Sequence, residues 1–123
     1  MEAYDEAFEE SFISNFLTSA AETANENFPK MVDPDTRLDK TVGLALNKTF
    51  QFHYTFINYT KDELNIEGLK NEIHPLMLND VITNPAYKLF RDFGVTMEYV
   101  YHDKNGHEVL KLTYSAFQYQ NDW

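Results

Sequence analysis

Residues 94–114 read GVTMEYVYHDKNGHEVLKLTY, and this stretch is the clearest β-hairpin in the chain. Apolar side chains stand at every second position before the turn and again after it, a period of two that is typical of half-buried strands. The alternating set is Val95, Met97, Tyr99 and Tyr101, followed by Leu110, Leu112 and Tyr114. The stretch therefore predicts an antiparallel pair with one face in the core.

The turn of this hairpin is Asp103-Lys104-Asn105-Gly106. Aspartate bonds to its own turn backbone, whereas asparagine and glycine tolerate positive φ. We expect a type I turn with Gly106 in a bulge, and a two-residue Asn-Gly type I′ turn is the alternative. Gly94 is expected just after the last turn of a helix.

Residues 3–27 are predicted to form one long helix, because apolar side chains recur at a spacing of four. The recurring residues are Phe8, Phe12, Phe16, Ala20 and Ala24, with Ile13, Leu17 and Ala21 beside them. Pro29 cannot continue the helix, which we expect to end near Asn27.

Two strands are predicted next, over residues 40–47 and 49–60. Val42, Leu44 and Leu46 would share one face of the first strand. In the second strand, one face is aromatic: Phe50, Phe52, Tyr54 and Phe56. The opposite face is semi-polar: Gln51, His53, Thr55, Ile57 and Tyr59. That second face is either covered by another element or a binding surface.

Residues 62–83 are predicted to be helical, with a kink or a break at Gly68 and Pro75. The segment 60–63 matches a capping box, and Asn84-Pro85 matches the start of a second, short helix. The order is helix, strand, strand, helical segment, strand, strand. Because both strand pairs are joined tightly, we expect an α+β fold in which the long N-terminal helix packs on a four-stranded antiparallel sheet.

The 123 residues correspond to a single domain, residues 1–123. Hydrophobic residues make up 43% and aromatic residues 15% of the chain, which is enough for a core without disulfides. The net charge of −10 disfavours nucleic acid and anionic membrane surfaces as partners. The acidic residues concentrate near the N-terminus. They form either a solvated helix face or a docking surface for a basic partner.

No catalytic motif is present. The sequence lacks Gly-x-Ser-x-Gly, His-Glu-x-x-His, a glycine-rich phosphate loop and a dinucleotide fingerprint. It also lacks cysteine, which removes thiolate zinc sites and a cysteine nucleophile. His102, Asp103 and His107 cluster at the hairpin turn, where a surface metal site is one interpretation and solvated turn histidines are the one we favour. We therefore predict a protein that is not an enzyme, with no catalytic residue, cofactor or metal.

Two segments carry a resemblance to known proteins. Residues 29–38 follow the pattern Pro-x-x-Val-Asp-x-x-Thr-Arg-Leu, and residues 94–106 follow Gly-Val-Thr-x-x-Tyr-x-Tyr-x-Asp-x-x-Gly. The chain resembles a loose group of small bacterial proteins that are exported, periplasmic or lipid-anchored and have no assigned activity. Members often carry a cysteine just before the Asn-Pro helix, where this chain has Val81-Ile82-Thr83, so no role of that cysteine carries over. The resemblance implies a helix-on-sheet domain and export.

The sequence contains no apolar run of about 18 residues, so no membrane span is expected. The first five residues show no signal peptide, which fits either a cytoplasmic protein or one whose export signal is not part of this sequence.

We predict a small, non-catalytic binding or accessory domain that is periplasmic or otherwise exported and acts on an unknown protein partner. The alternative is an acidic inhibitor or immunity-type protein that neutralises a basic enzyme. The candidate interaction surface comprises Asp5, Glu6, Glu9, Glu10, His53, Thr55, Ile57 and Tyr59.

Overall fold

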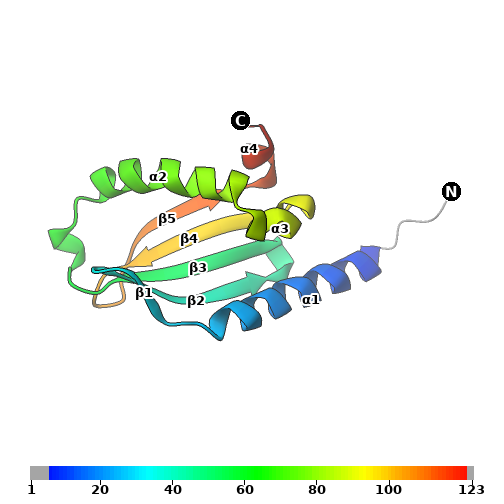
Figure 1. The fold of residues 1–123 in the computed structure, drawn as a ribbon, viewed down its shortest axis with the longest axis horizontal. Coiled ribbons are helices and arrows are strands. Elements are labelled where there is room, and N and C mark those ends of the chain that lie inside the picture. The colour runs from blue at the N-terminus through cyan, green and yellow to red at the C-terminus, as the bar shows by residue number, and fades with distance from the viewer. Residues whose placement is uncertain (1–5, 122–123) are drawn as a thin grey trace.

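The computed structural model of the chain describes the backbone of residues 6–121 and the side chains of residues 9–120 (Figure 1). The elements are α1 (Glu6–Asn25), β1 (Lys30–Asp33), β2 (Thr36–Leu44), η1 (Ala45–Asn47), β3 (Thr49–Phe56), η2 (Lys61–Glu63), α2 (Ile66–Thr83), η3 (Pro85–Tyr87), α3 (Lys88–Asp92), β4 (Thr96–His102), β5 (Glu108–Tyr114) and α4 (Ala116–Asn121).

The sheet has five strands in the order β1-β2-β3-β4-β5. Neighbouring strands are antiparallel except β3 and β4, which are parallel. The α+β class is as predicted, but the four-stranded, fully antiparallel sheet is wrong. A parallel pair needs a long crossover, which α2, η3 and α3 provide. The extra strand, β1, was missed because all four of its residues are exposed and show no alternation.

The predicted hairpin is confirmed as β4 and β5, and every residue of its alternating apolar set is buried. Gly106 has a φ of +88°, and its N–H donates to the Asp103 carbonyl at 3.0 Å. Gly94 has a φ of +68° directly after α3, where the Val95 N–H donates back to the Phe90 carbonyl at 2.9 Å. Both glycines therefore occupy the left-handed positions that the sequence predicted.

The helices cover one face of the sheet. Figure 1 shows α1 along the β2 side and α2 along the β5 side, with β3 and β4 between them. The buried line of α1 is Ile13, Leu17 and Ala21, which the sequence placed beside the main apolar line. Phe16 and Ala20 of that line are partly buried against the core, whereas Phe12 is 45% exposed. The Phe8 side chain lies outside the described residues. The helix rotates this way because Gly43 of β2 lets it approach closely: a Cβ at Gly43 would lie 2.6 Å from the Leu17 carbonyl oxygen.

A bulge in β2 explains a second difference. The register with β3 shifts between Leu38 and Lys40, which turns Thr41 and Gly43 toward α1. Val42 therefore faces away from the helices, and Leu46 is 99% exposed in η1. The predicted apolar face through these two residues does not form, because a single bulge reverses the alternation that follows it.

The two predicted helix starts are confirmed. The Thr60 N–H donates to Glu63 Oε1 at 2.8 Å in a capping box, although this box caps the short η2. Asn84 Oδ1 accepts from the Ala86 N–H at 2.9 Å. The break expected near Pro75 is absent, since α2 is one helix from Ile66 to Thr83. The tail, expected to extend the last strand, forms α4 instead.

Replacing Gly43 with alanine should lower the free energy of unfolding by about 1–3 kcal/mol, because α1 must move away from β2 to admit the new Cβ. Urea denaturation at neutral pH measures the change. The control is Leu46→Ala at the fully exposed position in η1, where we expect less than about 0.5 kcal/mol. Equal unfolding midpoints for Gly43→Ala and the unmodified chain would contradict the close helix contact.

Candidate functional site

The helix-free face of the sheet carries a hydrogen-bonded row of polar side chains. Gln51 Nε2 donates to Glu98 Oε1 at 2.8 Å, and the Thr113 hydroxyl donates to Glu98 Oε2 at 3.0 Å. The Nε2 atom of His53 lies 2.9 Å from Gln51 Oε1, and its ring stacks on His102 at 5.6 Å between centroids. Burial first, and then the neighbouring His102, lower the pKa of His53. These groups are partnered mainly by one another.

The structure does not bring the predicted interaction residues into one surface. His53 and Thr55 lie on the helix-free face of β3, and Ile57 follows directly after the strand. Tyr59 lies beyond the strand and lines a hollow on the helix side. Asp5 lies outside the described residues, and the Glu6, Glu9 and Glu10 positions belong to the first turns of α1. Only backbone is described for Glu6.

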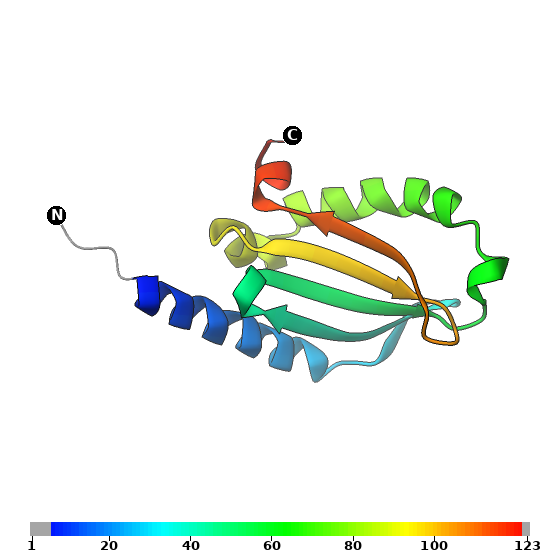
Figure 2. The ribbon, with the colours of Figure 1, turned by 180° about the vertical axis from the view of Figure 1, so that it is seen from behind.

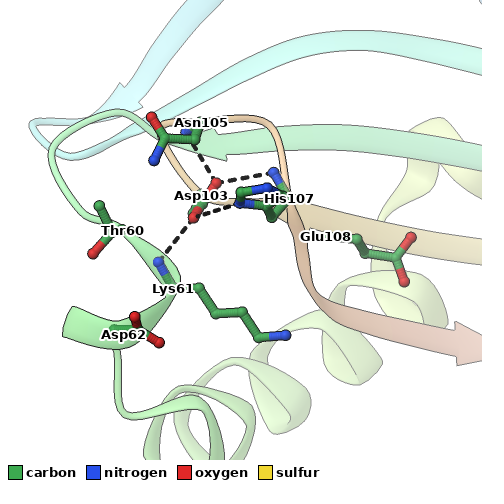
Figure 3. Close-up of a pocket in the computed structure, with 7 residues that line it drawn as sticks. All are labelled: Thr60, Lys61, Asp62, Asp103, Asn105, His107 and Glu108. Atoms are coloured by element: carbon green, nitrogen blue, oxygen red, sulfur yellow. Dashed lines mark hydrogen bonds and ion pairs between the residues drawn. The ribbon is translucent and has the colours of Figure 1, made fainter.

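A polar pocket of about 640 Å³ lies at the hairpin turn (Figure 3). Asp103 is 1% exposed there and joins two loops. Its Oδ1 accepts from the N–H groups of Asn105 and His107, both at 2.9 Å. Its Oδ2 accepts from the Lys61 N–H at 2.8 Å and lies 3.4 Å from His107 Nδ1. Figure 2 shows this turn and the loop into α2 side by side at one end of the sheet.

These bonds make Asp103 a structural clamp. Desolvation alone would raise the pKa of its carboxyl, but the N–H donors of His107, Lys61 and Asn105 outweigh it and lower the pKa to about 2. His102 does not join the cluster, because its Nδ1 donates to the Tyr54 carbonyl oxygen at 3.1 Å. Among the described residues, no group of three or more His, Asp or Glu side chains could hold a metal ion.

Asp103→Asn should lower the urea midpoint at neutral pH, and the deficit should shrink on acidification. The carboxylate has a lower pKa in the folded than in the unfolded chain, so its stabilisation is complete above about pH 4. It is lost as the pH falls through about 2. Denaturation curves of both chains from pH 7 to pH 2 measure this, with Asp62→Asn on the same loop as the control. A pH-independent deficit would show that the charge of Asp103 is not what stabilises the clamp.

Two further hollows lie on the helix side at the two ends of β3, one lined by Phe56 and the other by Phe50 and Phe52; we call them together the β3 groove. One, of about 440 Å³, lies between α2 and the β1–β2 turn. The other, of about 540 Å³, lies between α1 and the η3–α3 segment. The stretch of β3 from Phe50 to Phe56, which joins the two hollows, is about 20 Å of extended chain, and Tyr54 within it is buried and lines neither hollow.

The first hollow is lined by apolar side chains that water reaches. Leu76 is 69%, Val32 47% and Tyr59 38% exposed. The second hollow is lined by small and aromatic residues: Phe16, Ser19, Ala20, Thr23, Ala24, Phe50, Phe52, Ala86, Tyr87 and Phe90. The carboxylates among the lining residues are Asp33, Asp35 and Glu72, and no lysine or arginine of the described chain lines either hollow.

The Tyr99 hydroxyl has no hydrogen-bond partner among the described residues, although its side chain is 1% exposed. Such a group costs stability, because it loses water without gaining a protein partner. Tyr114, on the neighbouring strand, is equally buried, but its hydroxyl lies 2.8 Å from His74 Nδ1 and donates to the His74 carbonyl at 3.2 Å.

Tyr99→Phe should therefore raise the free energy of unfolding by about 1 kcal/mol. Tyr114→Phe, which removes a partnered hydroxyl from the same face, should lower it by about 1 kcal/mol. Thermal or urea denaturation of the three chains distinguishes these outcomes. A loss of stability in both variants would mean that the Tyr99 hydroxyl does find a partner.

The sequence places this fold in a family. Residues 11–111 match the family described as a domain of unknown function, DUF8479. The chain belongs to the DUF8479 family. No curated protein matches the chain.

Solved structures similar to this DUF8479 domain share its fold. A Pseudomonas aeruginosa protein inferred to be secreted has a TM-score of 0.76 at 14% identity, over 96% of this chain and 99% of that one. A pilotin of the Vibrio vulnificus type 2 secretion system has a TM-score of 0.74 at 9% identity, over 94% of this chain and 98% of the pilotin chain. A Vibrio cholerae type II secretion system pilotin has a TM-score of 0.63 at 9% identity, over 91% of this chain and 96% of the pilotin chain. These likenesses fit the exported group that the sequence resembles, and the residue pattern itself stays a prediction.

Sequence reasoning missed the β3 groove. One signal was available: Asp80 follows Ile73 and Met77 at spacings of seven and three residues, so a carboxylate lies on the apolar face of the helix. In the part of the DUF8479 domain that the structure describes, no helix is long and apolar enough to cross a membrane.

Proposed function

We propose that this DUF8479 domain is a non-catalytic accessory protein that binds an amphipathic helical segment of a protein partner in the β3 groove. The observation that carries the proposal is the pair of apolar hollows that make up the β3 groove, the first of which has exposed apolar side chains on its rim. Exposed apolar surface of this kind marks binding sites in soluble proteins.

The size of the β3 groove suits a helix. The stretch of β3 that joins the two hollows, about 20 Å, equals the length of about 13 helical residues. The walls formed by α1 and α2 stand on either side of β3 (Figure 1), an arrangement in which a partner helix would lay its apolar face on the aromatic strand.

The charges around the groove favour a partner segment that is basic. Asp33, Asp35 and Glu72 line the first hollow without a lining lysine or arginine, and the net charge of the chain is −10. Charge complementarity of this kind raises association rates and selects against acidic partners.

We further propose that the domain works outside the cytoplasm. Its fold is shared with a protein inferred to be secreted and with two secretion-system pilotins, and this likeness supports the location and the accessory role. Two other surfaces stand as alternatives: the helix-free face at His53, Thr55 and Ile57, and the acids of α1 that an inhibitor of a basic enzyme would use.

A photo-crosslinking amino acid at Leu76 should give a covalent adduct with a partner in the producing cell, and the same group at Leu46 should give none. Both positions are exposed, but only Leu76 lines the groove. A synthetic peptide of the crosslinked segment should then bind the purified domain, and Leu76→Asp should weaken binding about tenfold, since a buried leucine contributes roughly 1.5–3 kcal/mol.

The same scan includes Thr55 on the helix-free face and Glu10 on α1. Adducts that form only at Thr55 would move the site to the opposite face of the sheet. Adducts that form only at Glu10 would favour the acidic inhibitor. A crosslinked peptide whose affinity is unchanged by Leu76→Asp would overturn the groove proposal.

A further inference from the structure

The wall of the first hollow includes a loop that two turns of the protein hold in place. Tyr59 and Leu64, on the connection between β3 and α2, line this hollow. The Ile57 N–H donates to the Asp35 carbonyl at 2.9 Å, and Asn58 Nδ2 donates to Asp35 Oδ1 at 2.7 Å. These two bonds tie the start of the loop to the turn between β1 and β2.

The turn of the β4–β5 hairpin holds the middle of the same loop. The Lys104 N–H donates to the Tyr59 carbonyl at 2.9 Å. Asp103 Oδ2 accepts from the Lys61 N–H at 2.8 Å (Figure 3). The Lys61 carbonyl in turn accepts from the Leu64 N–H at 3.2 Å. Lys61 therefore stands between the two lining residues of the loop, and its own backbone is bonded to the hairpin turn.

The bond to Asp103 matters because little else holds Lys61. The short helix η2, of which Lys61 is the first residue, contains no buried residue, so packing contributes little to its position. Asp103, by contrast, is 1% exposed, and water does not compete for its oxygen atoms. A hydrogen bond to an ionised carboxylate is roughly twice as strong as one between neutral groups. The buried carboxylate is thus the firmest attachment of this part of the loop.

We propose that Asp103 is a positioning residue for the first hollow: its bond to Lys61 holds the loop whose side chains form part of the wall. No residue of the hairpin turn, 103–107, lines either hollow, so Asp103 acts on the hollow through the loop. The second hollow has no lining residue on this loop and is independent of the bond. The inference rests on the proposed function, because it concerns how tightly the groove binds a partner segment.

The bond can be removed from either side. Thr60, just before Lys61, has a φ of −87° and a ψ of 163°. This is the backbone that precedes a proline, and the first helical residue is a favoured place for one. Lys61→Pro therefore removes the N–H donor, and Lys61→Ala, which loses the same charge and keeps the N–H, is the matched control. Asp103→Asn removes the acceptor, since its one amide oxygen bonds to the turn and its amide nitrogen then faces the Lys61 N–H.

A displayed library of linear peptides of about 15 residues, slightly longer than the stretch of β3 that joins the hollows, supplies the probes. Peptides selected on the unmodified domain are sorted by loss of affinity for Leu76→Asp in the first hollow or Ala86→Asp in the second. Lys61→Pro and Asp103→Asn should each weaken the peptides that depend on Leu76 about fivefold, within the range of coupling in one hydrogen-bonded network. Peptides that depend on Ala86 alone should keep their affinity, and Lys61→Ala should leave both classes unchanged.

Hydrogen exchange and a double-mutant cycle separate positioning from general damage. In Asp103→Asn, the Lys61 N–H should exchange about tenfold faster, because its hydrogen bond is lost. In a domain that already carries Tyr59→Ala, Asp103→Asn should weaken the peptides that depend on Leu76 by less than about twofold, because the positioned ring is gone.

Three results would overturn the positioning role: equal weakening of both peptide classes, unchanged affinity despite faster exchange at Lys61, or an undiminished effect of Asp103→Asn in the Tyr59→Ala domain. Each of them leaves the groove standing. Failure to select any peptide that depends on Leu76 would count against the groove and the positioning role together.

Discussion

The parallel pairing of β3 with β4 is the constraint on which the rest of this fold depends. An antiparallel neighbour could have followed β3 after a short turn, but a parallel one requires the chain to return to the starting end of the sheet. Residues 57–95 make that return as α2, η3 and α3 over the face that α1 already occupies. The aromatic face of β3 is therefore covered from two sides, and one hollow opens at each end of the strand. The groove follows from the connection between the hairpins.

The Tyr99 hydroxyl is the one buried side-chain polar group of the described residues that has no hydrogen bond. A buried phenol without a partner costs free energy. Elsewhere the chain satisfies its buried polar groups well: the Asp103 carboxylate faces four nitrogen atoms of three residues, and the Tyr119 hydroxyl donates to the Val95 carbonyl at 2.9 Å.

What the sequence could predict was local. The hairpin, the left-handed Gly94 and Gly106, and the cap at Asn84 depend on residues a few positions apart, and all of them are present. The exposed strand β1 shows no alternation of apolar and polar side chains, so the sequence did not predict it. In β2, the bulge after Leu38 reverses which side chains face the helices, although the sequence alternates regularly there. The parallel pairing of β3 with β4 depends on contacts between residues more than forty positions apart in the sequence, such as Phe52 and Tyr99. No local sequence pattern encodes these contacts. The two hollows were missed for the same reason, since their linings combine residues far apart in the sequence, such as Val32 and Leu76.

The contact between Leu17 and Gly43 bears on how relatives of this chain can be sorted. With no Cβ at residue 43, α1 lies against the backbone of β2, and this sets how far Phe16 and Ala20 stand from the floor of the second hollow. A relative with a larger residue at that place must hold its first helix farther out, which widens the hollow. The residue at position 43 thus predicts, from sequence alone, whether a family member has a narrow or a wide second hollow.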